Sequence, residues 1–254
     1  MPIPLSLKPK YEYDLIRVGS QNDGGYLIEK NSLFQSEFLL SFGISTDWSF
    51  EKEFIEKNNV NLQCYDGSID DLYWLKWKKK AFKKALRFSF KEIYKYFKIK
   101  LSFHKFFNAQ NFACFYIGKK KGQIGIDEII KKISHKNIFF KIDIEGSEYE
   151  ILDELVMYKS RISGIAIEFH ECDKNIKLIN NFIEKIDMSL VHIHANNYDP
   201  VSKMGIPKTI EITLSSNPSI IGKQITLPHK FDMPNKYNKP EIKLEFSDEK
   251  NINY

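Results

Sequence analysis

The sequence of 254 residues contains only three cysteines and no long hydrophobic run. Cys64, Cys114 and Cys172 lie far apart without a C-x-x-C spacing, so they indicate neither a disulfide framework nor a thiolate metal site. No apolar stretch approaches the roughly 20 residues that a membrane-spanning helix needs, and residues 1–10 lack the apolar region of a signal peptide. We therefore expect a cytoplasmic protein that does not span a membrane.

Two sequence motifs are also missing. The residues after the first expected strand do not form a G-x-G-x-x-G turn, which counts against a nicotinamide-dependent dehydrogenase. No N-P-P-Y-type motif for methylation of nucleic-acid bases is present. What remains is an ordinary globular composition, 43% hydrophobic and 28% charged, which predicts one domain over residues 1–254.

The net charge of +5 is modest, and much of the positive excess is local. Residues 70–100 interleave lysines with aromatic residues, a pattern typical of an amphipathic helix whose lysines face water. We predict an inserted helical flap beside the functional site, in which Lys79 and Lys83 bind an anionic substrate. The basic residues in the first half of the insertion are Lys76, Lys78, Lys79, Lys80, Lys83, Lys84 and Arg87.

Elsewhere, hydrophobic periodicity predicts strands that alternate with helices. The expected strands cover residues 37–43, 60–65, 103–107, 137–144, 162–169, 190–194 and 209–214, and the expected helices cover residues 49–57, 126–133, 147–158 and 175–186. This order is typical of a doubly wound, Rossmann-like α/β domain with a mostly parallel sheet. The prolines and the loss of periodicity after residue 214 predict a tail, residues 215–254, that wraps the surface.

In such sheets, ligands bind beyond the carboxyl ends of the strands. Gly43 follows the first expected strand, where the absence of a side chain would let the backbone approach a cofactor, and Asp47 lies just beyond it. Asp66 ends the second strand, where a carboxylate commonly accepts hydrogen bonds from a ribose diol, and Gly67 and Ser68 continue the turn. We assign these residues to cofactor binding.

The later strands end in carboxylates and imidazoles. The pairs are Asp143 with Glu145, Glu168 with His170, and His192 with His194. The two members of a pair are separated by one residue, so in a strand they point to the same side of the sheet. Such groups can hold a cation, orient a cofactor or remove a proton. We interpret His192 as structural because it lies deeper in its strand.

Four segments resemble a known family. FFKIDIEGSEYEIL resembles the KIDVEGAEYEVL-type signature of FkbM-type methyltransferases, and IAIEFH resembles their next strand. LLSFGISTDWSFE resembles the cofactor-binding first motif of related members, which begin with a segment similar to RVGSQNDGGY. The first motif departs from the D-x-G-A-N-x-G form common in the family, because Ser41 replaces its acid and Ser45 its asparagine.

The resemblance spans about residues 17–214 and implies the seven-stranded methyltransferase fold, with S-adenosylmethionine over Gly43 and its ribose near Asp66. Asp143 and Glu145 match the family acids at the fourth strand. We further assign Asp23, Gly24 and Gly25 to the cofactor site and Tyr26 and Asn196 to the acceptor site. Family members commonly O-methylate sugars or other hydroxyl groups of capsules and surface polysaccharides. Some related enzymes are associated with O-methyl phosphoramidate, so an anionic acceptor is a further expectation.

Methyl transfer from a sulfonium requires alignment of donor and acceptor, and a neutral alcohol must also lose its proton. We predict that His170 or His194 removes this proton, oriented by Glu168 or Asp143, because histidine titrates near neutral pH. An acceptor that arrives ionised would need no base. A divalent metal held by the same groups is a less favoured alternative, and no residue is assigned as a metal ligand.

Two rival classes remain open at this point. Asp143 and Glu145 can be interpreted as the acidic pair of a metal-dependent nucleotide-sugar glycosyltransferase. The lysines interleaved with Trp74, Trp77 and Tyr94 suggest a nucleic-acid-binding protein or methyltransferase, which we consider the less favoured of the two.

Overall fold

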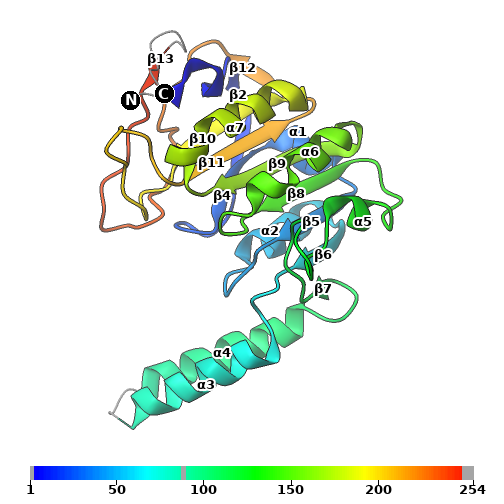
Figure 1. The fold of residues 1–254 in the computed structure, drawn as a ribbon, viewed down its shortest axis with the longest axis vertical. Coiled ribbons are helices and arrows are strands. Elements are labelled where there is room, and N and C mark those ends of the chain that lie inside the picture. Colours follow the sequence, from blue (N-terminus) through cyan, green and yellow to red (C-terminus); the bar gives the residue numbers. More distant parts are fainter. Residues whose placement is uncertain (1–2, 87–89, 248–254) are drawn as a thin grey trace.

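The computed structural model describes residues 3–86 and 90–247. At its centre is a sheet of seven strands in the order β10-β11-β9-β8-β5-β6-β7 (Figure 1). These strands are β5 (Phe38–Phe42), β6 (Asn61–Tyr65), β7 (Phe112–Ala113), β8 (Ile138–Ile142), β9 (Ile162–Phe169), β10 (Ser189–Ala195) and β11 (Ile210–Ser215). Helices lie on both sides of the sheet, so the expected α/β class is confirmed.

The sheet is mixed. Strands β5, β6, β7, β8 and β9 pair in parallel, whereas β11 runs antiparallel to both of its neighbours, β9 and β10. From β5 the chain moves outward through β6 and β7, and it then returns to the other side of β5 to form β8. The strand order therefore reverses between β5 and β8. In open α/β sheets this reversal marks the place where ligands bind, at the carboxyl ends of the strands.

Two hydrophobic clusters attach the helices to opposite faces of the sheet. Alternation along the strands directs Leu40 and Phe140 to one face, where they pack with α5, α6 and α7. Leu39 and Phe139 point to the other face and pack with α1 and α2. The helices are α1 (Lys30–Gln35), α2 (Ser49–Asn58), α3 (Asp71–Ala85), α4 (Phe90–Phe106), α5 (Ile126–Ile130), α6 (Glu148–Met157) and α7 (Cys172–Ile186), with short 3-10 helices at Leu5–Leu7 and Lys159–Arg161.

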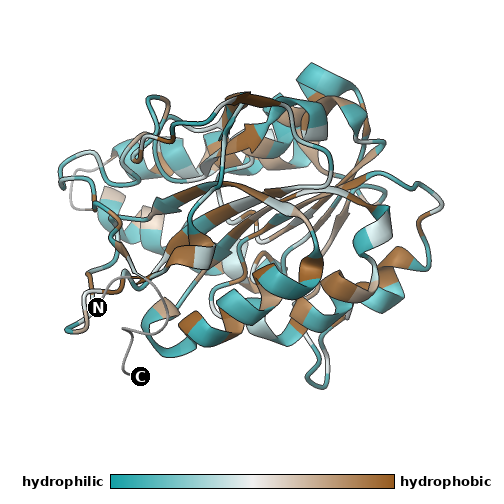
Figure 2. Ribbon diagram, turned by 90° about the horizontal axis from the view of Figure 1, so that it is seen from above, coloured by the Kyte–Doolittle hydropathy of each residue, from teal (hydrophilic) through white to brown (hydrophobic). Residues whose placement is uncertain are grey.

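Figure 2 shows hydrophobic strands at the centre and more hydrophilic residues on the outer helices. Within residues 3–86 and 90–247, every helix is too short or too polar to span a lipid bilayer.

A β-hairpin precedes the central sheet and was not predicted as strands. It consists of β3 (Leu15–Gly19) and β4 (Gly25–Glu29), joined by a turn that contains Asp23. The Arg17 side chain closes this turn by donating hydrogen bonds to the carbonyl oxygens of Ser20 and Asn22, each over 2.9 Å. The hairpin packs on the same sheet face as α2, through Val18 and Tyr26.

The insertion between β6 and β7 forms two antiparallel helices, α3 and α4, which project away from the sheet (Figure 1). The expected strand at residues 103–107 is wrong, because this stretch is the end of α4 and the residue after it. Phe103 and Phe107 are four residues apart and pack together on Trp48, and this helical packing outweighs the strand preference of phenylalanine. The strand next to β6 is instead β7.

The chain beyond β11 returns to the N-terminal segments and to the ends of β10 and β11. Its strand β12 (Ile220–Gly222) pairs with β2 (Glu12–Tyr13), and β13 (Phe246–Ser247) pairs with β1 (Ile3–Pro4). The Asn197 side chain, just after β10, donates hydrogen bonds to backbone carbonyl oxygens of the tail at residues 236, 239 and 240. The tail therefore buries the end of β10. The final residues of the predicted tail, 248–254, lie outside the described residues.

Candidate functional site

A cavity of about 300 Å³ lies at the carboxyl ends of β5, β6 and β8, where the strand order reverses. Its lining includes Gly43, Ser45, Tyr65, Asp66, Gly67, Ser68, Phe115, Tyr116, Ile117, Asp143, Ile144, Glu145 and Ser147. Three of these residues carry carboxylates and none carries a lysine or arginine charge. The cavity therefore combines aromatic and apolar walls with negative charge.

The loops around this edge of the sheet hold side chains in a strained backbone conformation. Ser45, Glu145 and Glu171 have φ values of 44°, 53° and 51°, in the left-handed region that residues other than glycine rarely occupy. They follow β5, β8 and β9, three adjacent strands of the sheet. Strain of this kind is concentrated at functional sites in proteins. Ser45 and Glu145 line the cavity, whereas Glu171 does not.

Asp66 anchors the loop that follows β5. One oxygen of its carboxylate, Oδ2, accepts hydrogen bonds from the backbone N–H groups of Ile44 and Ser45, over 3.0 and 2.9 Å. The other oxygen, Oδ1, accepts hydrogen bonds from the N–H and the hydroxyl of Ser68. Asp66 and Ser68 both line the cavity. The Asp66 carboxylate, however, already accepts hydrogen bonds from the two loops that form the cavity wall.

Gly43 lines the cavity and also has a structural role. A Cβ atom at this position would lie 1.6 Å from the carbonyl oxygen of Asp143, and the residue has a φ of +73°. Glycine is therefore required for the contact between the β5 and β8 loops, whether or not a cofactor approaches it. Gly67 is similar, because a Cβ there would lie 2.4 Å from the ring of Tyr116.

A cluster of acids around His170 borders the cavity. The Nε2 atom of this histidine lies 3.4 Å from Oε1 of Glu168, 3.6 Å from Oε2 of Glu145 and 4.0 Å from Oδ1 of Asp143. Its Nδ1 atom lies 3.1 Å from Oε1 of Glu148. The carboxyl ends of β8 and β9 thus bring Asp143, Glu168 and His170 together, as the sequence pattern predicted. Asp143 belongs to both the cluster and the cavity wall.

The cluster strongly perturbs the charges of its members. Burial alone lowers the pKa of His170, but its hydrogen bonds with Glu148 and Glu168 and their charges outweigh that effect and raise the pKa to about 11. Burial and the charge of Asp143 raise the pKa of Glu168 to about 8. At neutral pH the His170 imidazole is therefore protonated and has no free lone pair. The structure does not support this histidine as a base.

His194 is separated from the cavity. Its Nδ1 lies 3.3 Å from a carboxylate oxygen of Glu211, and its Nε2 lies 3.0 Å from one of Glu241 in the tail. Burial lowers the pKa of His194, but these two partners more than compensate and raise it to about 10. His194 is only 4% exposed, and it is fully engaged as a buried cation. It does not fit the predicted role of base.

The residues of the early turn lie near the acids but not in the cavity wall. The Asp23 carboxylate accepts hydrogen bonds from Asn196 and Asn235, over 3.4 and 3.2 Å. Gly24 faces Asp47, and Asp47 accepts a hydrogen bond from the N–H of Ser49 at the start of α2. Asp47, assigned to the cofactor, therefore stabilises a helix end. The neighbouring Gly25 is required for packing, since a Cβ there would lie 1.9 Å from a backbone oxygen.

Asn196 and Tyr26 are buried rather than available to an acceptor from the surface. The Asn196 amide lies 3.3 and 3.4 Å from the two carboxylate oxygens of Glu168, so it orients that acid. Tyr26 is 2% exposed, and its hydroxyl has no hydrogen-bond partner within residues 3–86 and 90–247. Burial and the charges of Asp143 and Glu168 raise the pKa of Tyr26 well above its usual value. Neither residue lines the cavity.

Lys79 and Lys83 are exposed on α3, in the half of the helix nearer its outer end. No residue of α3 or α4 lines the cavity, and both helices project beyond the β7 edge of the sheet (Figure 1). The insertion is thus a protruding hairpin rather than a flap that covers the site. Some of its aromatic residues pack between the two helices, as Trp74 does with Tyr96 and Phe103, whereas others, such as Tyr94, are exposed. Arg87 of the predicted basic stretch lies outside the described residues.

Several residues of the site gave no signal in the sequence. Tyr116 and Phe115 form the aromatic wall of the cavity, but they lie in an irregular segment after β7. Lys141 is buried within β8, where it donates a hydrogen bond to the carbonyl oxygen of Gly43 and lies 3.7 Å from Asp143. In the sequence, Glu148 is only one of several acids at the start of an expected helix. Its contact with His170 depends on the turn between β8 and α6, which places the two side chains together.

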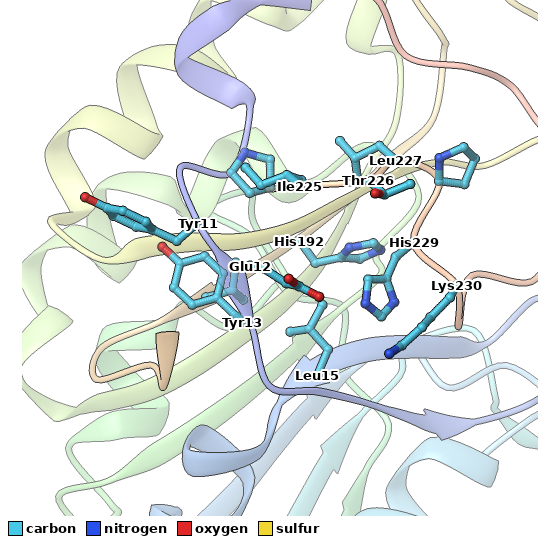
Figure 3. A pocket seen from close by; sticks show the side chains of 13 residues that line it. Tyr11, Glu12, Tyr13, Leu15, His192, Ile225, Thr226, Leu227, His229 and Lys230 are labelled. Carbon is cyan, nitrogen blue, oxygen red and sulfur yellow. The ribbon is translucent and has the colours of Figure 1, made fainter. Parts of the chain in front are cut away.

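A second cavity, of about 240 Å³, lies between β2, β10 and residues 225–230 (Figure 3). His192 and His229 line it, with their ring centroids 6.1 Å apart. The Nε2 atom of His192 lies 2.9 Å from Asp232. No residue that we assign to the cofactor or the acceptor lines this cavity.

Comparison of the chain with models of known protein families and with curated proteins found no match.

Proposed function

We propose that the protein is an S-adenosylmethionine-dependent O-methyltransferase that acts on a sugar hydroxyl or on a phosphate or phosphoramidate acceptor in capsule or surface-glycan biosynthesis. The observation that carries the proposal is the cavity at the strand-order reversal, which has three carboxylates and no basic side chain in its lining. S-adenosylmethionine carries a sulfonium and an ammonium group, so its charge suits this cavity. The seven-stranded α/β sheet and the motifs similar to FkbM-type methyltransferases agree with it.

The residues of the cavity fit the parts of this cofactor. Tyr116 and Phe115 offer flat surfaces for an adenine ring. Asp66 holds the backbone of Ile44 and Ser45 at the position where a ribose would lie. Asp143 and Glu145 supply negative charge for the amino-acid end and the sulfonium. When bound, the cofactor supplies an activated methyl group for an in-line displacement.

The acid cluster would receive the acceptor, because Asp143 borders both the cavity and the cluster. Alignment of the acceptor oxygen with the donor is the main contribution that the protein needs to make. The two histidines that the sequence suggested as bases are buried cations, so proton removal must depend on the carboxylates, on a bound cation or on an acceptor that is already ionised.

Calorimetric titration of the full chain with S-adenosylmethionine, S-adenosylhomocysteine and a nucleotide sugar tests the proposal. We expect one equivalent of either adenosyl ligand to bind and the nucleotide sugar not to bind. Glu145→Lys should weaken S-adenosylmethionine binding roughly fivefold, because it places a cation at the cavity rim. Glu171→Lys is the matched control: this glutamate is also exposed and has a positive φ, but it lies outside the cavity. Equal affinities of the two variants would contradict the proposed cavity.

The rival glycosyltransferase is distinguished by the same titration. A nucleotide sugar carries a diphosphate, which the carboxylates of this cavity would repel unless a cation intervened. Binding of a nucleotide sugar with Mn²⁺, and none of S-adenosylhomocysteine, would favour the rival. Mass spectrometry of cell extracts incubated with the protein and a methyl-labelled donor would then identify the acceptor.

A further inference from the structure

We propose that Asp143, Glu168 and His170 bind a divalent transition-metal ion. One potential ligand atom from each of the three residues lies within 4.8 Å of the others. The sequence pattern left a metal as the less favoured alternative and assigned no ligand. The proposal rests on how the inner and outer atoms of these three side chains are arranged.

The inner atoms are more widely spaced than in a typical hydrogen bond, and their spacing suits a shared ion. Nε2 of His170 lies 3.4 Å from Oε1 of Glu168 and 4.0 Å from Oδ1 of Asp143. Typical N–H···O hydrogen bonds are about 2.7–3.2 Å long. Two ligands that each lie about 2.1 Å from one ion are at most about 4.2 Å apart. Both observed separations fall within that limit.

The outer atoms of the three side chains are held by other residues. Oε1 of Glu148 accepts hydrogen bonds from the N–H groups of Ile144 and Gly146, so it is an acceptor toward Nδ1 of His170 as well. His170 therefore keeps its proton on Nδ1, and an ion bound between the three side chains would displace the second proton, which the surrounding acids otherwise hold on Nε2. This carboxylate–histidine arrangement recurs behind metal-bound histidines, where it fixes the tautomer and the ring orientation.

The two carboxylates are supported in the same way. Oδ2 of Asp143 lies 3.7 Å from the ammonium group of Lys141, which leaves Oδ1 toward His170. The amide of Asn196 orients Glu168. Each of the three side chains thus has a polar partner outside the group of three.

A second observation concerns a buried polar group near these charges. The Tyr26 hydroxyl is buried and has no hydrogen-bond partner among the described residues. After burial itself, the charges of Asp143 and Glu168 have the largest effects on the pKa of Tyr26. The Tyr26 hydroxyl therefore lies within electrostatic range of the cluster. A water molecule on the ion would donate a hydrogen bond to this hydroxyl oxygen. Glu145 is not included, because its side chain is 87% exposed.

One imidazole and two carboxylates suit Mn²⁺, Fe²⁺, Co²⁺ or Zn²⁺ better than Mg²⁺ or Ca²⁺, which prefer oxygen ligands alone. Binding of the ion does not depend on the proposed function. The role of the ion rests on that function, because in a methyltransferase the ion would lower the pKa of an acceptor hydroxyl that reaches it.

Titration of the chelator-treated full chain with MnCl₂, followed by the electron paramagnetic resonance signal of free Mn²⁺, tests the inference without any activity assay. We expect one bound ion per chain, with an affinity in the micromolar range. His170→Gln and Asp143→Asn should each weaken binding by at least about tenfold. The controls Glu171→Gln and His104→Gln alter an exposed acid and an exposed histidine outside the cluster, and they should bind as the wild type does.

Absence of stoichiometric binding by the wild type, or equal affinities in all four variants, would overturn the metal site. Circular dichroism verifies folding of each variant. Asp143 is more exposed than His170, so Asp143→Asn remains informative if His170→Gln does not fold. Titration with S-adenosylhomocysteine in the presence of chelator separates the two proposals, since cofactor binding without metal binding would remove only the metal site.

Discussion

At the scale of single residues, the site depends on side chains that hold backbone in place. Asp66 accepts hydrogen bonds from the N–H groups of Ile44, Ser45 and Ser68 and from the Ser68 hydroxyl. Since Asp66 is 8% exposed, water cannot readily replace it. A residue that seemed suited to bind a ribose directly therefore acts first on the loop that forms the cavity wall.

We expect Asp66→Ala to lower the free energy of unfolding by about 1–3 kcal/mol, because it leaves the buried N–H group of Ile44 without an acceptor. It should also weaken S-adenosylmethionine binding by more than tenfold, since the loop would no longer be held. Denaturant titration and calorimetry measure the two effects. The control Asp47→Ala removes a carboxylate on the same loop that lies outside the cavity. Unchanged affinity in Asp66→Ala would exclude Asp66 from cofactor binding.

At the scale of elements, the α3–α4 hairpin is separate from the cavity. Its packing belongs to a cluster that includes Trp74, Tyr96 and Phe103 and that continues to Trp48 at the start of α2. The lysines of α3 face water. A helix pair with buried rings between its members therefore explains part of the basic and aromatic pattern, whereas Phe90 and Tyr94 remain exposed.

Trp74→Ala should destabilise the hairpin by about 3–5 kcal/mol, because it empties a buried aromatic position. We expect rapid proteolysis within residues 71–106, whereas S-adenosylhomocysteine should still bind. Leu72→Ala is the control, since Leu72 lies on the exposed side of the same helix. Loss of ligand binding in Trp74→Ala would show instead that the hairpin supports the cavity.

The double charge reversal Lys79→Glu with Lys83→Glu tests whether the hairpin captures an anionic acceptor. We expect the affinity for S-adenosylmethionine to stay unchanged, because neither lysine lines the cavity. If the hairpin binds the acceptor, the variant should raise the KM for that acceptor, and high salt should mimic it because exposed charges are screened over about 8 Å. Identical KM values for variant and wild type at low salt would show that Lys79 and Lys83 do not bind the acceptor and only keep the surface of α3 hydrated.

At the scale of the whole molecule, a buried cation connects the sheet to the tail. His194 lies on β10, Glu211 on β11 and Glu241 in the tail. The pKa of His194 rises from its usual 6.5 to about 10 on folding, because its two acidic partners outweigh the opposing effect of burial. This pairing contributes its full stability below pH 6.5 and loses it as the pH rises toward 10.

We therefore expect the free energy of unfolding to fall between pH 7 and 9.5, with a contribution from His194 of at most about 1.4 kcal/mol per pH unit. His194→Gln should flatten this part of the profile, whereas His104→Gln, at an exposed position, should not. Urea unfolding across this pH range provides the profiles. A steeper or equal slope in His194→Gln would contradict the assigned ion pair.

Local patterning was sufficient to predict most of the central sheet. The expected strands at 37–43, 60–65, 137–144 and 162–169 correspond to β5, β6, β8 and β9, because each is a short apolar run bounded by turn residues. The same logic failed at residues 103–107, where contacts with Trp48 favour a helix. The β3–β4 hairpin was missed because its short strands are held by pairing with each other and by packing on the sheet.

The sequence by itself determined that acids and imidazoles follow successive strands, since strand ends can be recognised from alternation and turns. Only the tertiary structure decided which of them meet. His170 lies close to Asp143 and Glu168, whereas His194 pairs with Glu211 and with Glu241 of the tail. Their charge states are likewise set by burial and by partners distant in the chain, and no local pattern records these. For the same reason the sequence suggested two neutral bases, and the fold made both histidines cations.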